Sequence, residues 1–152
     1  MSEGILITRP DYDDTTFYLH EWAEEVKELA DSLGHHVFDL KNDRANRKNF
    51  EGILKSKNPD ILFLNGHGTE IALCGHENEE ILDLKNMVIL KSKVVYARSC
   101  RTAKILGFES VKQCIAKAFI GYNNDFIFPY DARRTANPKK ELLCEPILSS
   151  SN

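Results

Sequence analysis

Five short runs of apolar residues recur along the chain, at residues 4–8, 35–40, 61–64, 94–97 and 118–122. Each run is bounded by polar residues, glycine or proline, and most contain few polar interruptions. Continuous apolar runs of this length are typical of strands that are covered on both faces. The pattern therefore predicts five main strands in a buried, mostly parallel sheet.

Between these runs, apolar residues follow helical spacing. The spacing predicts helices over residues 15–33 and 44–57, the first ended by Gly34 and the second closed by Asn58-Pro59. Further along, we expect a hairpin around residues 75–78, a short helix over 84–90, and a brief helix or turn over 102–106 that Gly107 ends. Ser110 is expected to cap the next helix, and Leu142, Leu143 and Ile147 to belong to one more.

Strands that alternate with helices predict right-handed βαβ units. We expect an α/β fold, a three-layer α/β/α sandwich whose central sheet has the main strands in the order 2-1-3-4-5. In such sheets, ligands gather at the carboxyl ends of the strands.

Length and composition indicate one domain, over residues 1–148, with a disordered tail at 149–152. A net charge of −3 argues against a nucleic-acid-binding protein, and no apolar run is long enough to span a membrane. The N-terminus lacks the pattern of a signal peptide, so we expect a cytoplasmic protein whose four cysteines are thiols.

Reactive residues follow two of the predicted strands. Residues 61–64 run into Asn65-Gly66-His67-Gly68, and residues 94–97 run into Arg98-Ser99-Cys100. In the expected order these strands are neighbours, so an imidazole and a thiol would meet at one edge of the sheet. An imidazole converts a thiol into the nucleophilic thiolate, and backbone N–H groups can stabilise the oxyanion that forms.

A third segment reaches the same edge. The acidic loop over residues 9–14 follows the first strand, and we interpret it as a solvated loop that also supplies negative charge to the N-terminus of the next helix.

The two strand-end motifs resemble the caspase–gingipain–legumain superfamily of cysteine peptidases. They are most similar to its prokaryotic gingipain-like and CHAT-type branches, and the order of elements agrees over roughly residues 5–128. The resemblance implies a caspase-like fold, hydrolysis of peptide bonds, and no cofactor or metal. It also implies that His67 is the general base and acid, Cys100 the nucleophile, and the amides of Gly68 and Cys100 the oxyanion hole.

The family's substrate pocket corresponds to the segment after the fifth strand, which here contains Tyr122, Asn123, Asn124 and Asp125. Asp125 could accept a basic side chain, or it could be an ordinary turn residue. Arg98 stands where many members have an acidic residue or a Gln-Ala pair before the nucleophile, so it would either bind a substrate carboxylate or face solvent. The chain is also short for this family, which suggests that a protein partner, an oligomer or further chain completes the fold.

Other interpretations remain at the level of the sequence. A catalytically inactive caspase-like module would bind a ligand or partner at the same crevice. His67, Cys74, His76 and Cys100 have the chemistry of zinc ligands, but their spacing is not that of a usual zinc knuckle. A flavodoxin-like domain shares the strand order, but no glycine-rich phosphate loop follows the first strand.

Overall fold

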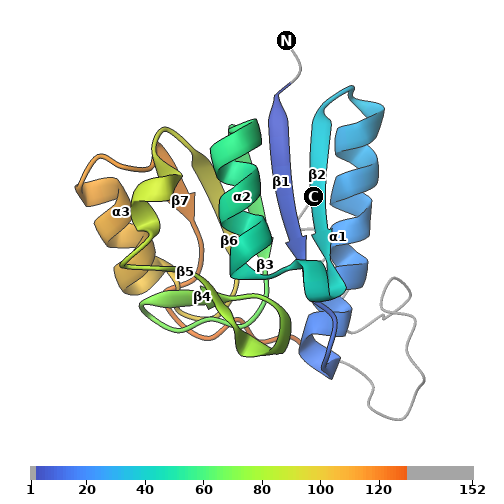
Figure 1. Ribbon diagram of the computed structural model, residues 1–152. Helices are drawn as coiled ribbons and strands as arrows, with labels where there is room; N and C mark the ends of the chain where they lie inside the picture. The colour runs from blue at the N-terminus through green and yellow to red at the C-terminus, as the bar shows by residue number, and fades with distance from the viewer. Residues whose placement is uncertain (1–2, 130–152) are drawn as a thin grey trace.

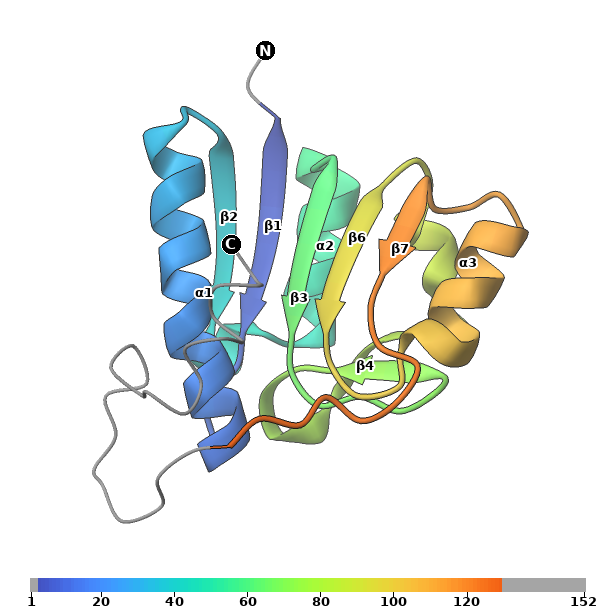
Figure 2. The same ribbon diagram turned by 180° about the vertical axis from the view of Figure 1, so that it is seen from behind.

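The computed structural model describes residues 3–129, and a five-stranded parallel sheet lies at its centre (Figures 1 and 2). Its strands are β1 (Gly4–Arg9), β2 (His36–Lys41), β3 (Ile61–Asn65), β6 (Val94–Arg98) and β7 (Ala118–Ile120). The order across the sheet is β2-β1-β3-β6-β7, and every neighbouring pair is parallel. The predicted order 2-1-3-4-5 of the main strands is therefore confirmed.

Helices and short turns connect these strands. They are α1 (Asp14–Ser32), η1 (Asn42–Arg44), α2 (Arg47–Lys57), η2 (His76–Asn78), η3 (Met87–Leu90), the π-helical turn η4 (Ala103–Gly107) and α3 (Phe108–Lys112). The predicted hairpin is also present: β4 (Ala72–Cys74) and β5 (Glu80–Asp83) pair antiparallel, outside the main sheet.

Helices cover both faces of the sheet, as expected for an α/β sandwich. Figure 2 shows α1 on one face, over β2 and β1, with α2 and α3 on the opposite face. Among the described helices, α1 alone lies on its face, so β6 and β7 have no helix over them there, and Ile120 of β7 is 56% exposed. The sheet is thus covered unevenly.

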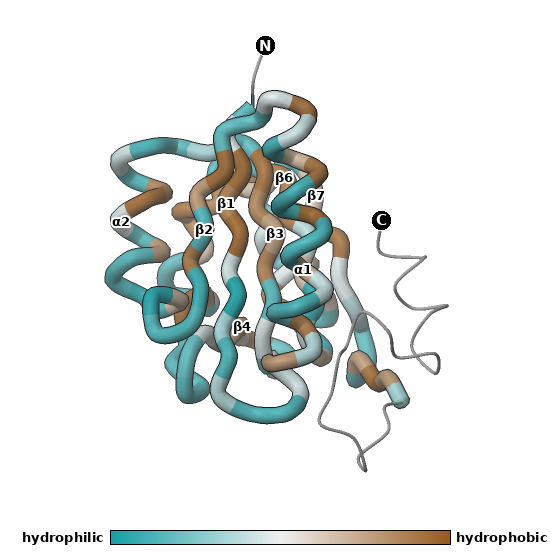
Figure 3. The backbone as a smooth tube through the Cα atoms, turned by 90° about the vertical axis from the view of Figure 1, so that its right-hand side faces the viewer, coloured by the Kyte–Doolittle hydropathy of each residue, from teal (hydrophilic) through white to brown (hydrophobic). Residues whose placement is uncertain are grey.

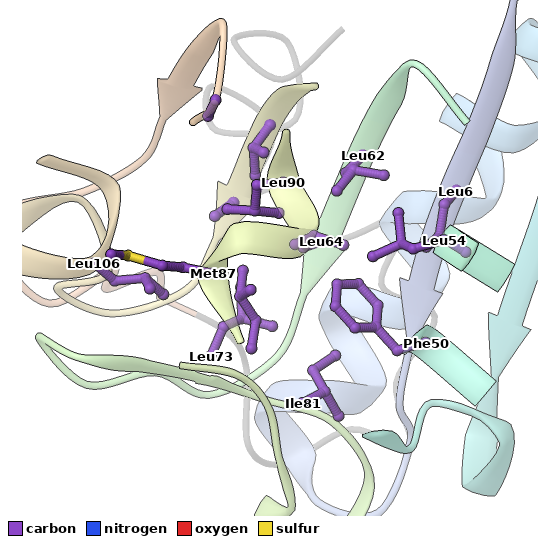
Figure 4. Packing of buried hydrophobic residues seen from close by; sticks show 14 of the residues in the cluster. Leu6, Phe50, Leu54, Leu62, Leu64, Leu73, Ile81, Met87, Leu90 and Leu106 are labelled. Carbon is purple, nitrogen blue, oxygen red and sulfur yellow. The ribbon is translucent and has the colours of Figure 1, made fainter. Parts of the chain in front are cut away.

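The larger core lies on the α2 side. Leu6, Leu62 and Leu64 point from the strands toward Phe50 and Leu54 of α2 (Figure 4). The hairpin contributes Leu73 and Ile81 to the same cluster. In Figure 3 the most hydrophobic stretches follow the strands, whereas the loops beyond their carboxyl ends are largely hydrophilic.

Local sequence explains where α1 begins and ends. Asp13 caps its N-terminus: the Asp13 side chain accepts a hydrogen bond from the Thr16 backbone, and the Thr16 side chain accepts one from the Asp13 backbone. At the other end, Gly34 adopts a φ of +80°, which favours glycine and stops the helix after Leu33.

Three details of the sequence prediction are wrong. Gly107 does not end a helix, because η4 continues through it into α3, and Ser110 lies inside α3 rather than at its cap. Gly107 is instead required for packing: a Cβ there would lie 2.4 Å from the Phe119 ring. The helix expected over 84–90 is reduced to the 3-10 turn Met87–Leu90.

The predicted helix with Leu142, Leu143 and Ile147, and the predicted tail at 149–152, lie outside the described residues. Within residues 3–129, none of the helices combines the length and the hydrophobicity needed to cross a membrane.

Candidate active site

The register of the sheet brings His67 and Cys100 to one rim. β3 and β6 are adjacent, and their last paired residues are Asn65 and Arg98. Each reactive residue comes two positions after this last pair. The connection continues beyond the strands, since the Gly66 N–H donates to the Arg98 carbonyl at 3.4 Å. Both loops therefore leave the sheet side by side, as the strand patterns predict.

The loop that carries His67 is held by the hairpin. The Cys74 N–H donates to the His67 carbonyl at 2.9 Å. Gly66 has a φ of +152°, and a Cβ on it would lie 2.2 Å from the Cys74 carbonyl oxygen, so only glycine fits there. The hairpin, which the sequence analysis places outside the main sheet, thus fixes the backbone next to the imidazole.

The imidazole itself is held by an acidic residue. Nε2 of His67 lies 2.6 Å from Oδ2 of Asp13, and the His67 side chain is 33% exposed. Tyr12 closes a second side, with its ring edge-on to His67 at a centroid distance of 6.2 Å. The Tyr12 hydroxyl donates to Oδ1 of Asn78 at 2.9 Å and accepts from the Asn78 N–H at 3.1 Å, which anchors the tyrosine to η2.

Asp13 serves the helix and the imidazole at once. Oδ1 accepts from the Thr16 N–H at 2.8 Å, while Oδ2 faces His67. Burial on its own raises the pKa of the Asp13 carboxyl, but hydrogen bonds from Thr16 and His67 lower it by more, so the net pKa lies below the ordinary value. Asp13 is consequently an ionised carboxylate at neutral pH.

Sequence reasoning identified only half of this role. The acidic loop was expected to supply charge to the next helix, and the cap confirms that expectation, but the contact with His67 was missed. A signal for it was available: in the predicted order the first strand lies beside the third, so residues that follow both strands must emerge next to each other.

Cys100 lies against a different part of the chain. Its sulfur accepts a hydrogen bond from the Phe126 N–H at 3.4 Å, and the side chain is partly exposed. The Arg101 N–H donates to the Asn124 carbonyl at 3.0 Å, and the Ala103 N–H to the Tyr122 carbonyl at 3.1 Å. The segment over residues 122–126, which contains the expected substrate-binding residues, therefore runs directly beside the loop of Cys100.

The same segment continues to α1. Phe126 stacks near Tyr122 at a centroid distance of 4.7 Å, and Phe128 lies 4.8 Å from the ring of Trp22. Trp22 is only 2% exposed. Residues 126–128 thus form a clasp, by which we mean a segment that runs from Cys100 across the rim to α1 (Figure 2).

In residues 3–129 no hydrogen bond joins the His67 ring to the Cys100 sulfur; the ring contacts Asp13 and the sulfur contacts Phe126. Such bonds are often long in an enzyme without substrate and shorten only when substrate binds. The arrangement therefore supplies a base, a nucleophile and their common rim, but not a formed ion pair.

Two backbone amides lie close to the sulfur. A Cβ on Gly68 would lie 2.7 Å from the Cys100 carbonyl oxygen, so the backbones at Gly68 and Cys100 approach each other closely. Within the described part of the chain, neither the Gly68 N–H nor the Cys100 N–H donates to a protein acceptor. Both amides are available to an oxyanion.

Arg98 is not where either sequence interpretation put it. Its side chain is fully buried, so the expectations that it faces solvent or binds a substrate carboxylate are wrong for this conformation. Its Nε donates to Oδ1 of Asn65 at 2.7 Å, its guanidinium donates to the Leu19 carbonyl of α1 at 3.2 Å, and it lies over the Phe63 ring. Burial lowers the pKa of Arg98 to about 10, which leaves it charged at neutral pH.

The other expected pocket residues have partners within the chain. Asp125 forms an ion pair with Arg101, with Oδ1 and Nε 2.9 Å apart, and both side chains are about half exposed. Burial, followed by a hydrogen bond with Tyr96, raises the pKa of Tyr122 to about 12, so Tyr122 is a neutral phenol. Asn123 lies between them in the same segment.

The zinc alternative gains no support from the geometry. Over the described range, no three His, Cys, Asp or Glu side chains converge to hold a metal ion. In particular, His67, Cys74, His76 and Cys100 do not form such a group. Burial raises the pKa of the Cys74 thiol, which disfavours the thiolate that a metal would need.

The site is thus defined by its own geometry: a carboxylate-bound imidazole and a thiol at the carboxyl ends of two adjacent central strands, with two unengaged amides beside them. Comparison with known proteins adds no relative to this description. The chain matches no protein-family model, and no curated protein is significantly similar to it.

Proposed function

We propose that this chain is a caspase-like cysteine peptidase that hydrolyses peptide bonds with His67 and Cys100. The observation that carries the proposal is the placement of these residues, each two positions beyond the paired ends of β3 and β6. The contact of His67 with an ionised Asp13 supports it, because an oriented imidazole is what a thiol needs to become nucleophilic.

The reaction follows from these groups. His67 takes the proton of Cys100, and the thiolate sulfur bonds to the carbonyl carbon of the substrate while the carbonyl electrons move to oxygen. The amides of Gly68 and Cys100 donate to that oxyanion. His67 then protonates the amine as the C–N bond breaks, and water hydrolyses the thioester to release the acid and restore the thiol.

The substrate is a peptide or protein, and its residue before the cut lies beside residues 122–125 in this proposal. The ion pair of Asp125 with Arg101 is exposed, so a basic substrate side chain can compete for the carboxylate at little cost. We also propose that the protein acts in the reducing cytoplasm, where its thiols persist, and that a partner or further chain completes the caspase-like fold.

A second function is favoured by one observation. The Phe126 N–H bonds to the Cys100 sulfur, and this contact covers the thiol with the chain's own backbone. A catalytically inactive caspase-like module, in which the rim binds a ligand or partner, would have no need to free that sulfur.

Alkylation by iodoacetamide at about pH 6 separates the two. An ordinary thiol with a pKa near 8.5 supplies well under 1% thiolate at that pH. Cys114 is exposed and provides an ordinary thiol within the same molecule, and peptide mapping by mass spectrometry follows each cysteine separately. For a peptidase, Cys100 should be alkylated about tenfold faster than Cys114 or more, and His67→Gln should remove the difference.

A peptide library provides the functional test. The wild-type chain should cleave some library members under reducing conditions, whereas Cys100→Ala should cleave none. Equal alkylation of Cys100 and Cys114, together with no cleavage by the wild type, would overturn the peptidase in favour of the binding module.

A further inference from the structure

The carboxylate of Asp13 joins two structures that are far apart in the sequence. Oδ1 accepts from the Thr16 N–H at 2.8 Å, in the first turn of α1, and Oδ2 contacts Nε2 of His67 at 2.6 Å. An ionised carboxylate can only accept hydrogen bonds. The contact therefore requires that Nε2 carries a proton.

From this geometry we infer that Asp13 is a positioning residue that fixes the tautomer of His67. A neutral imidazole has one N–H and one basic nitrogen. With the proton held on Nε2, the basic nitrogen is Nδ1, which is then the atom that can take a proton from Cys100. The tautomer is a property of the Asp13–His67 pair; its catalytic consequence rests on the proposed function.

The helix cap makes this inference sharp, because it dictates how an amide would sit at position 13. Asparagine caps helices as well as aspartate does, so Asp13→Asn should leave α1 intact. The Thr16 N–H needs an oxygen, so the amide oxygen must take the place of Oδ1. The amide NH₂ then takes the place of Oδ2 and points at His67.

An NH₂ group in that place reverses the imidazole. Nε2 must become the acceptor, so the ring proton moves to Nδ1, and the nitrogen that was basic is blocked. The same logic applies to the aspartate of serine-protease triads, where the change to asparagine gives the wrong tautomer and lowers kcat about 10⁴-fold. Here the helix, rather than a dedicated pocket, sets the orientation of the amide.

The test compares the wild-type chain with Asp13→Asn and with Asp14→Asn, which removes the same charge from the adjacent position in the first turn of α1. Long-range ¹H–¹⁵N correlation spectra at about pH 9, where histidine rings are generally neutral, report the tautomer of each ring. His67→Gln identifies the His67 signals. We expect the Nε2–H form in the wild type and in Asp14→Asn, and the Nδ1–H form in Asp13→Asn.

Alkylation of Cys100 gives the second measurement. Asp13→Asn should reduce the alkylation rate of Cys100 at about pH 6 to that of Cys114, and Asp14→Asn should leave it unchanged. Should Asp13→Asn fail to fold, Asp13→Ser replaces it: serine caps the helix with one oxygen but is too short to hold the ring, and a mixture of tautomers is expected.

The outcomes separate this inference from the peptidase proposal. An unchanged tautomer in Asp13→Asn, or in Asp13→Ser if that variant is needed, overturns the role of Asp13 whatever the catalytic activity. A reversed tautomer in a protein that cleaves no peptide supports the role of Asp13 in orienting His67 and rejects only the peptidase.

Discussion

The two faces of the sheet differ most at their carboxyl ends. On the α2 face the strands stay apolar to the rim, where Leu64 and Ala97 belong to the large buried cluster. On the α1 face the apolar residues give way to a buried polar row at the last strand positions: Arg9, Asn65 and Arg98. One face therefore serves mainly as core, and the other changes from core to a polar support just below the site.

The polar row binds α1 rather than solvent. Arg9 pairs with Asp39 and Glu24 and donates to the His20 carbonyl of α1 at 3.4 Å, while Arg98 donates to the Leu19 carbonyl. These contacts fix α1 relative to the rim, and α1 begins at the cap that holds His67. The comparison teaches that apolar packing stabilises the fold, whereas buried polar groups set the position of the helix that reaches the site.

The largest effect should come from breaking the apolar face. Phe50 is fully buried in the α2-side cluster, so Phe50→Ala leaves a cavity and should lower the free energy of unfolding by about 3–5 kcal/mol. Phe108→Ala is the control, because Phe108 is 58% exposed. Urea titrations followed by circular dichroism measure both; a loss below about 1 kcal/mol for Phe50→Ala would show that this core does not dominate.

A smaller effect is expected at the rim itself. Gly68→Ala places a Cβ 2.7 Å from the Cys100 carbonyl oxygen, so the two loops must separate, which should cost about 2–3 kcal/mol and slow the alkylation of Cys100. Gly52→Ala is the matched control: its Cβ meets nothing within 4 Å in α2, and it should stabilise the chain by about 0.5–1 kcal/mol. Equal effects of the two changes on unfolding would contradict the close approach.

The polar row should contribute less to stability than its burial suggests. Arg98→Met leaves the Asn65 Oδ1 and the Leu19 carbonyl without this donor, but it also removes a buried charge, so we expect a net loss of about 1–2 kcal/mol. The alkylation rate of Cys100 should fall as α1 loosens. Arg101→Met, which breaks an exposed ion pair, should cost less than about 1 kcal/mol. An unchanged alkylation rate in Arg98→Met would separate the polar row from the site.

The smallest effect is a dependence on pH. The pKa of Asp13 is lower in the folded chain than its ordinary value of 3.8, so its stabilising contribution is present above that value and is lost as the pH falls through the folded pKa. Unfolding midpoints of wild type and Asp13→Asn, measured from pH 6 to about pH 2.5, should therefore converge below 3.8. Curves that remain parallel down to the lowest pH would argue against an ionised Asp13.

Much of the fold could be predicted because it depends on local pattern. Buried parallel strands appear as continuous apolar runs, and glycine and proline mark where helices end, as at Gly34 and Pro59. Gly107 misled the prediction for the same reason: its glycine serves the packing of Phe119, not a helix end. A rule about local conformation cannot recognise a glycine that is needed by a distant ring.

The site was predictable only as far as strand order could carry it. His67 and Cys100 follow adjacent strands, and order alone places them at one rim. Asp13 was missed because its partner lies 54 residues away, and Arg98 was misplaced because a charged residue at a strand end is normally assigned to the surface. Long-range hydrogen bonds leave no periodic trace in a sequence.

The clasp has an optical consequence. Trp22 is the only tryptophan of the chain, and the ring of Phe128 lies against it. If residues 126–128 swing away from Cys100, water reaches the indole and its emission shifts to longer wavelength. Intrinsic fluorescence therefore allows the uncovering of the sulfur to be timed in a stopped-flow instrument, with no added dye.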